Sequence, residues 1–193
     1  MILEGIMTTL DADETVNISP MGPIVSDDMQ EMLFRPFQTS RTYQNLKRDR
    51  HGVFHVTDNV EMIARAAVGQ LEPPPSMIPT TIFSGRIIDD ACRWYAVEVT
   101  SLDDSQQRAE ITTRVVDQGR LREFFGLNRA KHAVVEIAIL ATRVHLLPMA
   151  QIREDVDRLA VLIEKTGGAA EQAAFAFLDE YIRTAAVKAG SPD

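Results

Sequence analysis

The pattern of apolar residues changes near residue 126, and this change constrains the fold more than any other feature of the sequence. Before it, short apolar runs are broken by turn residues, as in GVFHV and RWYAVEVTSLD, which is typical of β-strands. After it, Ala, Leu, Ile, Glu and Arg recur at helical spacing, which predicts helices over 128–146, 148–165 and 169–188. The sequence predicts a mainly β protein with α: a β-barrel over 1–126, and a helical region over 127–193 packed on the barrel or on a dimer partner.

The barrel region is predicted to contain about six or seven strands with small helices. ILEGIMTTL and TVNIS flank DADE as a hairpin, and EMLFRPF is a third strand that Pro36 limits to an edge or an end. A short helix is expected from the TSRT segment to about Arg48, and NVEMIARAAVGQL shows helical spacing. EPPPSMIP is expected to be a rigid connector without regular structure. The remaining predicted strands are GVFHV, IFSGRIID, RWYAVEVTSLD and RAEITTRVVDQGR.

Composition excludes several classes of protein. The chain has 193 residues, of which 45% are hydrophobic and 25% charged, as in an ordinary soluble globular protein. Its formal net charge of −8 argues against general nucleic-acid binding. Cys92 is the only cysteine, which excludes an intramolecular disulfide and a cysteine-based metal site. The acidic N-terminus is not a signal peptide, and AVVEIAILA is too short to span a bilayer. We therefore expect a cytoplasmic protein with no membrane segment and no metal.

The predicted helix that begins near residue 40 has an unusually polar first turn. Thr39, Ser40 and Thr42 supply hydroxyl donors and Arg41 supplies a guanidinium, with Arg35 close by in the sequence. Because the N-terminus of a helix has free N–H groups and a partial positive charge, this pattern indicates an anion-binding site. The alternative is that Ser40 or Thr39 is simply an N-cap. A cation in the first turn opposes the helix dipole, which favours a bound anion.

Three groups of residues in VNISPMGPIV and SRTYQNLKRDRHGVFHV form a combined pattern: Asn17, Ser19 and Pro20, then Thr42, Asn45 and Leu46, and finally Gly52, Phe54 and Val56. In this pattern the sequence resembles the flavin reductase-like branch of the FMN-binding split-barrel proteins. Over its whole length, including FGLNRAKHAVVEIAILATRVHLL and KTGG, it is similar to an uncharacterised family of that superfamily. The resemblance implies a homodimer with one FMN per subunit, bound near the dimer interface, and a phosphate at the TSRT helix start.

The flavin ring requires backbone groups and a small amide, and the stretch NISPMG offers both. Asn17 and Ser19 alternate to one face of a strand, and Pro20 breaks the strand so that backbone groups are freed. The alternative is a polar strand face that ends in a turn. Met21 packs either on the ring or, as its type favours, in the core.

A second group of cations opens the helix predicted from residue 128. Asn128 is the expected N-cap, and Arg129, Lys131 and His132 fall in the first turn. One interpretation is a second anion site, for the FMN phosphate of the partner subunit or for the acidic part of a substrate. The other is that carboxylates elsewhere in the chain neutralise these cations.

Three functions follow from these features. The first is an FMN-dependent oxidoreductase that acts on a small-molecule substrate or on NAD(P)H, although no Gly-x-Gly-x-x-Gly nucleotide motif is present. The second is an FMN-binding or electron-carrying module without its own substrate. The third is a flavin-free split barrel that binds another protein or a tetrapyrrole. The resemblance supplies a cofactor and no catalytic residue.

Overall fold

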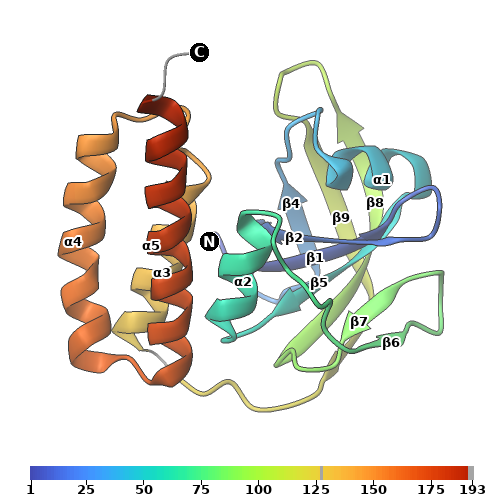
Figure 1. Ribbon diagram of the computed structural model, residues 1–193. Coiled ribbons are helices and arrows are strands. Elements are labelled where there is room, and N and C mark those ends of the chain that lie inside the picture. Colours follow the sequence, from blue (N-terminus) through green and yellow to red (C-terminus); the bar gives the residue numbers. More distant parts are fainter. Residues whose placement is uncertain (127, 191–193) are drawn as a thin grey trace. The chain divides into compact units, whose positions relative to one another are not determined.

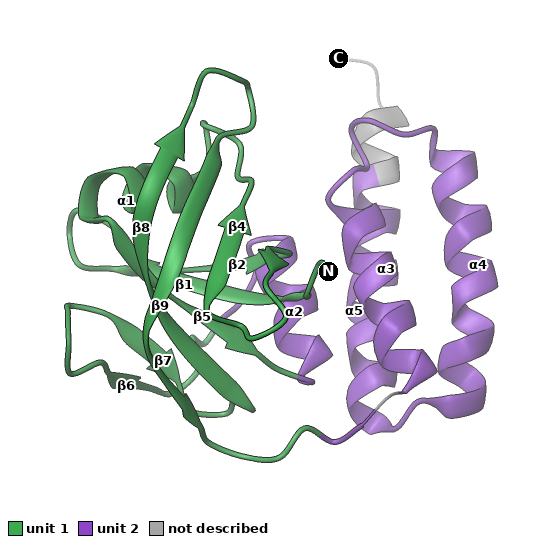
Figure 2. Cartoon of the chain, turned by 180° about the vertical axis from the view of Figure 1, so that it is seen from behind, with its two compact units in different colours: residues 1–57, 73–124 green, residues 58–72, 125–193 purple. Residues whose placement is uncertain are grey.

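The computed structural model describes residues 1–126 and 128–190, with side chains to residue 185, and the chain forms two compact units. The first unit comprises residues 1–57 and 73–124, and the second comprises residues 58–72 and the chain from Phe125 onward (Figure 2). The sequence-based division at residue 126 places 58–72 with the strands. The structure groups this segment with the C-terminal helices instead, because its apolar face is buried among them.

The first unit is a curled antiparallel sheet of seven strands in the order β2-β1-β5-β8-β9-β4-β3 (Figure 1). A separate hairpin pairs β6 with β7. β6 lies within the predicted connector EPPPSMIP, so the expectation that this segment has no regular structure is wrong for its last residues. The strands are β1 (Gly5–Leu10), β2 (Val16–Met21), β3 (Ile24–Val25), β4 (Glu31–Phe34), β5 (His51–Val56), β6 (Met77–Pro79), β7 (Arg86–Ile88), β8 (Arg93–Asp103) and β9 (Glu110–Arg120).

The two edge strands of this sheet are consecutive in the chain, and this brings the two ends of the curl together. Gly5 lies opposite Met21 in the β1–β2 ladder, and Ile2 forms an isolated bridge to Ile24 in the same antiparallel sense. β2 and β3 therefore continue one line, interrupted only at residues 22–23, and β3 links the N-terminal segment to β4. The other edge of β2 has no strand partner in the described part of the chain, so the sheet stays open along β2.

One short helix, α1 (Arg41–Asp49), packs against β1 and β2. Its Leu46 joins the core of the first unit, where the Phe34 and Phe54 rings meet edge to face with centroids 5.8 Å apart. Gly52 on β5 permits this packing, because a Cβ there would lie 2.9 Å from the Met7 sulfur and 3.3 Å from Leu46 Cδ2. The glycine of the Gly–x–Phe–x–Val pattern thus has a structural reason independent of any ligand.

The second unit is a bundle of helices with a core rich in alanine. Its helices are α2 (Val60–Ala67), α3 (Arg129–Ala141), α4 (Met149–Thr166) and α5 (Ala169–Gly190). α3 ends at Ala141 and not at residue 146 as predicted, because the chain turns there and packs Val144 and Leu147 against the bundle core. No helix in the described part of the chain is long and apolar enough to cross a bilayer. The fully buried core residues include Ala64, Ala130, Val134, Ile137, Ile152, Leu178 and Ile182.

Candidate functional site

The N-terminus of α1 is capped and still has free donors. Ser40 is the N-cap: its Oγ accepts a bond from the Tyr43 N–H at 3.2 Å, and its carbonyl accepts one from Gln44 at 3.2 Å. The N-cap alternative is therefore correct for Ser40. The backbone N–H groups of Arg41 and Thr42 have no acceptor among the described residues. A capped helix start with two open N–H groups remains able to bind an anion.

Three exposed side chains precede or open this helix in the sequence. Arg41 is 64% exposed, and its Nη1 donates to Asp11 Oδ2 at 3.0 Å. Arg35 and Thr39 are also exposed, and within the described part of the chain neither side chain has a hydrogen bond or an ion pair. The side chains of Arg35 and Thr39 are therefore free, and Arg41 is held by one ion pair with Asp11. An exposed ion pair of this kind contributes little to stability.

Beneath the helix start, a buried polar network joins α1 to the β1–β2 hairpin. Asn17 Nδ2 donates to Thr9 Oγ1 at 3.1 Å and to Thr42 Oγ1 at 3.0 Å. Asn45 Nδ2 donates to Thr9 Oγ1 at 3.0 Å and to Asp11 Oδ1 at 2.7 Å. The side chains of Thr9, Asn17, Thr42 and Asn45 are all buried. This network fixes the position of α1 relative to the hairpin.

The network changes the interpretation of three residues that the sequence assigns to cofactor contact. Asn17, Thr42 and Asn45 are each no more than 4% exposed, and their side chains bond to one another or to Thr9 and Asp11. Side chains committed in this way hold the site in position. The amide nitrogen of Asn17 is turned toward Thr9 and Thr42, and contact of Asn17 and Ser19 with a flavin ring stays a prediction. The backbone N–H of Thr42 remains open, and its role toward an anion also stays a prediction.

The other residues of the NISPMG stretch lie at the end of β2. Ser19, Pro20 and Met21 are half-buried and pair with β1 residues 5–7. Met21 packs on the core of the first unit, in agreement with the expectation that core is the favoured place for this residue type. A role for these three residues at a flavin ring remains a prediction.

Sequence reasoning missed two residues of this site, Thr9 and Asp11. Thr9 accepts from both asparagines, and Asp11 links the buried Asn45 to the exposed Arg41. In the sequence, Asp11 is the first residue of DADE, where the pattern indicates only a turn. Its position directly after a strand was the available signal. The turn itself is fixed by bonds from Asp11 N to Thr15 O at 2.8 Å and from Glu14 N to Asp11 O at 3.0 Å.

The second cationic cluster, at the start of α3, is largely neutralised within the helical unit. Asn128 caps the helix by accepting from the Lys131 N–H at 3.1 Å, and Thr166 Oγ1 accepts from the Ala130 N–H at 3.1 Å. Lys131 Nζ lies 2.9 Å from Glu171 Oε1 and donates to the Asp58 carbonyl at 2.7 Å. These contacts favour matched cations over a second anion site.

The cations of the α3 cluster differ in whether they have a partner. Arg129 and His132 are exposed, and within the described residues their side chains have no ion pair. Burial alone would raise the pKa of Glu171, but bonds from Lys131 and from the Gly168 N–H outweigh it and hold this pKa below its usual value. Glu171 is therefore ionised at neutral pH and compensates the charge of Lys131. Lys131 is engaged by Glu171 and by the Asp58 carbonyl, and its role at an anion site stays a prediction.

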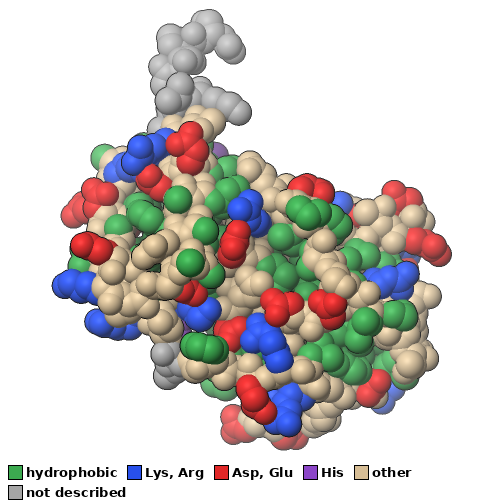
Figure 3. All heavy atoms as spheres, turned by 60° about the horizontal axis from the view of Figure 1, so that its bottom comes forward, with side chains coloured by type: hydrophobic (Ala, Val, Ile, Leu, Met, Phe, Trp, Pro, Cys, Tyr) green, Lys and Arg blue, Asp and Glu red, His purple; other side chains and the backbone are tan. Residues whose placement is uncertain are grey.

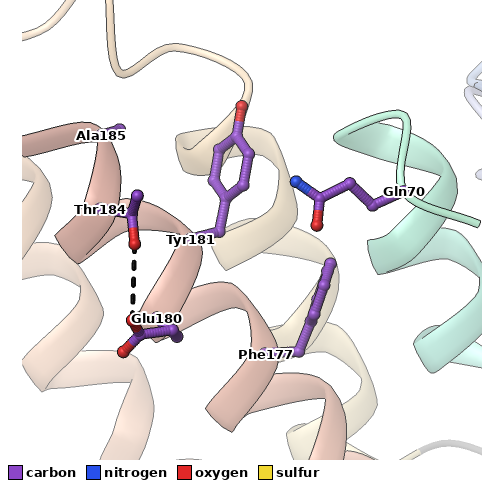
Figure 4. A pocket seen from close by; sticks show the side chains of 6 residues that line it. All are labelled: Gln70, Phe177, Glu180, Tyr181, Thr184 and Ala185. Atoms are coloured by element: carbon purple, nitrogen blue, oxygen red, sulfur yellow. Dashed lines mark hydrogen bonds between the residues drawn. The ribbon is translucent and has the colours of Figure 1, made fainter. Parts of the chain in front are cut away.

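Other features of the surface are less specific. A recess of about 290 Å³ in the helical unit lies where Phe177 and Tyr181 of α5 face Gln70, and Glu180 pairs only with Thr184 at 3.4 Å (Figure 4). On the face drawn in Figure 3, basic and acidic side chains are interspersed. No three metal-ligating side chains gather anywhere in the described part of the chain. Among the described residues, the start of α1 is the place where open backbone N–H groups lie beside an exposed arginine.

Comparisons with known proteins identify solved structures with a similar fold. A solved FMN-bound protein from Methanosarcina mazei is 23% identical, covers 93% of this chain and 94% of its own, and superposes with a TM-score of 0.80. An FMN-binding protein from Thermus thermophilus with bound 1-cyclohex-2-enone is 12% identical and covers 62% of this chain and 70% of its own, with a TM-score of 0.52. The flavin reductase of styrene monooxygenase from Pseudomonas putida S12 is 14% identical and covers 63% and 82%, with a TM-score of 0.52.

These similarities show a flavin reductase-like split-barrel fold. None of the curated proteins matches the chain. The family described as "Protein of unknown function (DUF447)" matches twice, with its N-terminal domain over residues 3–122 and with a second segment over residues 128–180. Its description is also the one given for the Methanosarcina mazei protein. The chain belongs to the DUF447 family.

Proposed function

We propose that this protein binds FMN and acts as an oxidoreductase of the flavin reductase-like type, as a homodimer. The observation that carries the proposal is the start of α1, where two backbone N–H groups are open beside the exposed Arg41. The FMN-bound Methanosarcina mazei protein, which shares the fold over nearly the whole chain, supports the choice of ligand.

The residues at this helix start fit the phosphate of FMN. A phosphate monoester needs several donors and a compensated charge, which the N–H groups of Arg41 and Thr42, the Thr39 hydroxyl and the guanidinium groups of Arg35 and Arg41 supply. Within the described part of the chain, Asp11 is the one carboxylate bonded to Arg41, and its other oxygen is engaged by Asn45. We assign the ring to Ser19, Pro20 and Met21 as a prediction.

The protein's part in the chemistry is to bind, orient and shield. When bound, FMN supplies the redox chemistry, by accepting and returning a hydride or electrons. The buried network of Thr9, Asn17, Thr42 and Asn45 holds α1 rigidly on the hairpin, so the phosphate donors are fixed before the ligand arrives. Preorganisation of this kind reduces the entropy lost on binding.

Removing the Arg41 guanidinium is expected to weaken FMN binding without disturbing the fold. Arg41→Gln should raise the dissociation constant about 10- to 100-fold, because a charge-assisted bond to phosphate contributes about 1.5–3 kcal/mol. Asp11→Asn should have the opposite sign, since it removes the carboxylate that competes for Arg41 but keeps an oxygen that can accept from Asn45. FMN titrations followed by flavin fluorescence measure both changes.

Arg158→Gln is the matched control for this experiment. Arg158 lies in the helical unit, is 77% exposed and pairs with one carboxylate, Asp155, at 2.7 Å, as Arg41 does with Asp11. Its replacement should leave FMN affinity unchanged. If wild type, Arg41→Gln and Arg158→Gln bind FMN with equal affinity, the phosphate of FMN does not bind at this helix start. Steady oxidation of NADH or NADPH by the FMN-loaded protein would distinguish an enzyme from an electron-carrying module.

Dimerisation is expected because the first unit exposes large apolar side chains. Phe37 is 44% exposed, Phe124 is 48% exposed, and Ile78 and Leu121 are exposed to a similar degree. A second subunit that covers part of this surface would stabilise the protein. Sedimentation velocity at micromolar concentration should show a dimer. A monomer at every concentration would contradict both the dimer and a flavin site shared between subunits.

A further inference from the structure

A second recess lies in the first unit, around the first residue of β5 and the segment that precedes β7. Its volume is about 310 Å³, at the small end of the range for ligand pockets. Ile82 and Val116 form apolar walls that are 48% and 38% exposed. Because these side chains remain open to water, a small apolar ligand that covers them would be stabilised by the hydrophobic effect. The other lining residues are Asp49, Arg50, His51, Phe83 and Glu98.

The charges that line this recess leave one uncompensated cation. Asp49 pairs with Arg48 at 2.6 Å. Glu98 pairs with Arg114, also at 2.6 Å. Arg50 instead donates from Nη2 to the Val99 carbonyl at 3.2 Å and has no carboxylate partner in the described part of the chain. The recess therefore favours a ligand with a single negative charge.

The recess also offers a flat aromatic wall that is held in place. The His51 and Phe83 rings lie with centroids 4.2 Å apart and planes inclined by 32°. His51 Nε2 lies 3.2 Å from the Ser84 carbonyl, which restrains the imidazole. Arg50 is fixed too, since it ends α1 in the left-handed conformation with φ 63° and its side chain is tied to β8. Planar ligands pack well against such fixed rings.

We propose that this recess binds a small aromatic carboxylate. The ring of the ligand lies against Ile82, Phe83 and Val116, and its carboxylate accepts bonds from the free N–H groups of Arg50. An arginine fork matches the two oxygens of a carboxylate, which gives the site its selectivity for an acid. The proposal does not depend on FMN, because none of the lining residues belongs to the start of α1.

Benzoate is a suitable probe, and amide NMR spectra of the ¹⁵N-labelled protein report where it binds. Benzoate at millimolar concentration should shift the amide signals of residues 82–84 and 116 in a saturable manner. Benzylamine has the same ring with the opposite charge, and acetate has the carboxylate without the ring. Both should bind at least 10-fold more weakly, because each lacks one of the two interactions. Absence of saturable shifts at these amides, or equal binding of benzoate and benzylamine, would overturn the proposal.

The decisive variant is Arg50→Asn, which suits the left-handed conformation at this position because asparagine tolerates positive φ. It should weaken benzoate binding about 10- to 100-fold, as expected for loss of a charge-assisted bond. Arg158→Gln should bind benzoate like wild type. If Arg50→Asn does not fold, Val116→Asp serves instead, since it places a carboxylate on an exposed wall of the recess and should abolish benzoate binding. Unchanged binding in the folded variant would refute the assignment.

Discussion

Replacing Lys131 by methionine is expected to lower the free energy of unfolding by about 2–4 kcal/mol. Lys131 and Glu171 form an ion pair whose side chains are only 18% and 9% exposed, and Lys131 also donates to the Asp58 carbonyl. Removing the cation leaves Glu171 partly buried without its counter-charge, which costs far more than losing a surface pair. Urea denaturation followed by circular dichroism measures the change.

Arg129→Gln is the control for this effect, because Arg129 lies two residues away on the same helix but is exposed. It should change stability by no more than about 0.5 kcal/mol, and any gain would reflect removal of a cation from the unfavourable end of the dipole. The double variant Lys131→Met with Glu171→Gln should recover part of the loss, since it no longer leaves an unpaired charge. A Lys131→Met variant as stable as Arg129→Gln would show that the pair contributes nothing.

Acidification from pH 6.5 to pH 4 is expected to reduce stability by about 3 kcal/mol through His55 alone. His55 is completely buried: its Nδ1 bonds to the Ile6 carbonyl at 3.1 Å, and its Nε2 accepts from the Ile88 N–H at 3.0 Å. Burial lowers the pKa of His55 to about 4. The unfolded chain takes up a proton near pH 6.5 while the folded protein does not, so stability is full above pH 6.5 and declines as the pH falls.

The variant His55→Gln separates this contribution from the carboxylates. It is expected to be less stable than wild type at pH 7, because the bonds to Ile6 and Ile88 are weakened, but its stability should be nearly constant between pH 6.5 and pH 4.5. His132→Gln, at an exposed position of α3, should keep the wild-type decline. Denaturant titrations across this pH range measure the slopes. If the stability of His55→Gln still falls with pH as in wild type, groups other than His55 cause the decline in stability.

Helices and strands could be predicted from the sequence wherever neighbouring residues alone determine them. The hairpin around DADE, α1, β5 and the two long strands β8 and β9 follow from alternation, turn residues and capping. β6 was missed because three prolines precede it and only its pairing with β7 makes it a strand. The strand order, and the membership of α2 in the helical unit, depend on contacts between distant segments, which no local pattern encodes.

The same distinction applies to the candidate site. The cap at Ser40 and the exposed cation at Arg41 are properties of one helix start, so the sequence indicated them. The bond between Asn17 and Thr42 joins a strand to a helix, and the pair of Lys131 and Glu171 joins two helices. At Asn17, Thr42 and Lys131, the residue type suggests ligand contact. Only the tertiary structure shows that the same polar groups are satisfied inside the protein.

The membership of α2 in the second unit has a consequence for the order of events during translation. Val60 and Ala64 of α2 are buried against residues of α3 and α5, but α5 begins roughly a hundred residues later in the chain. At about 5–20 residues per second, the ribosome needs on the order of ten seconds to add that length. Strands β6 to β9 are synthesised within this interval, after β1 to β5, so α2 remains a nascent segment with an uncovered apolar face until α5 leaves the exit tunnel.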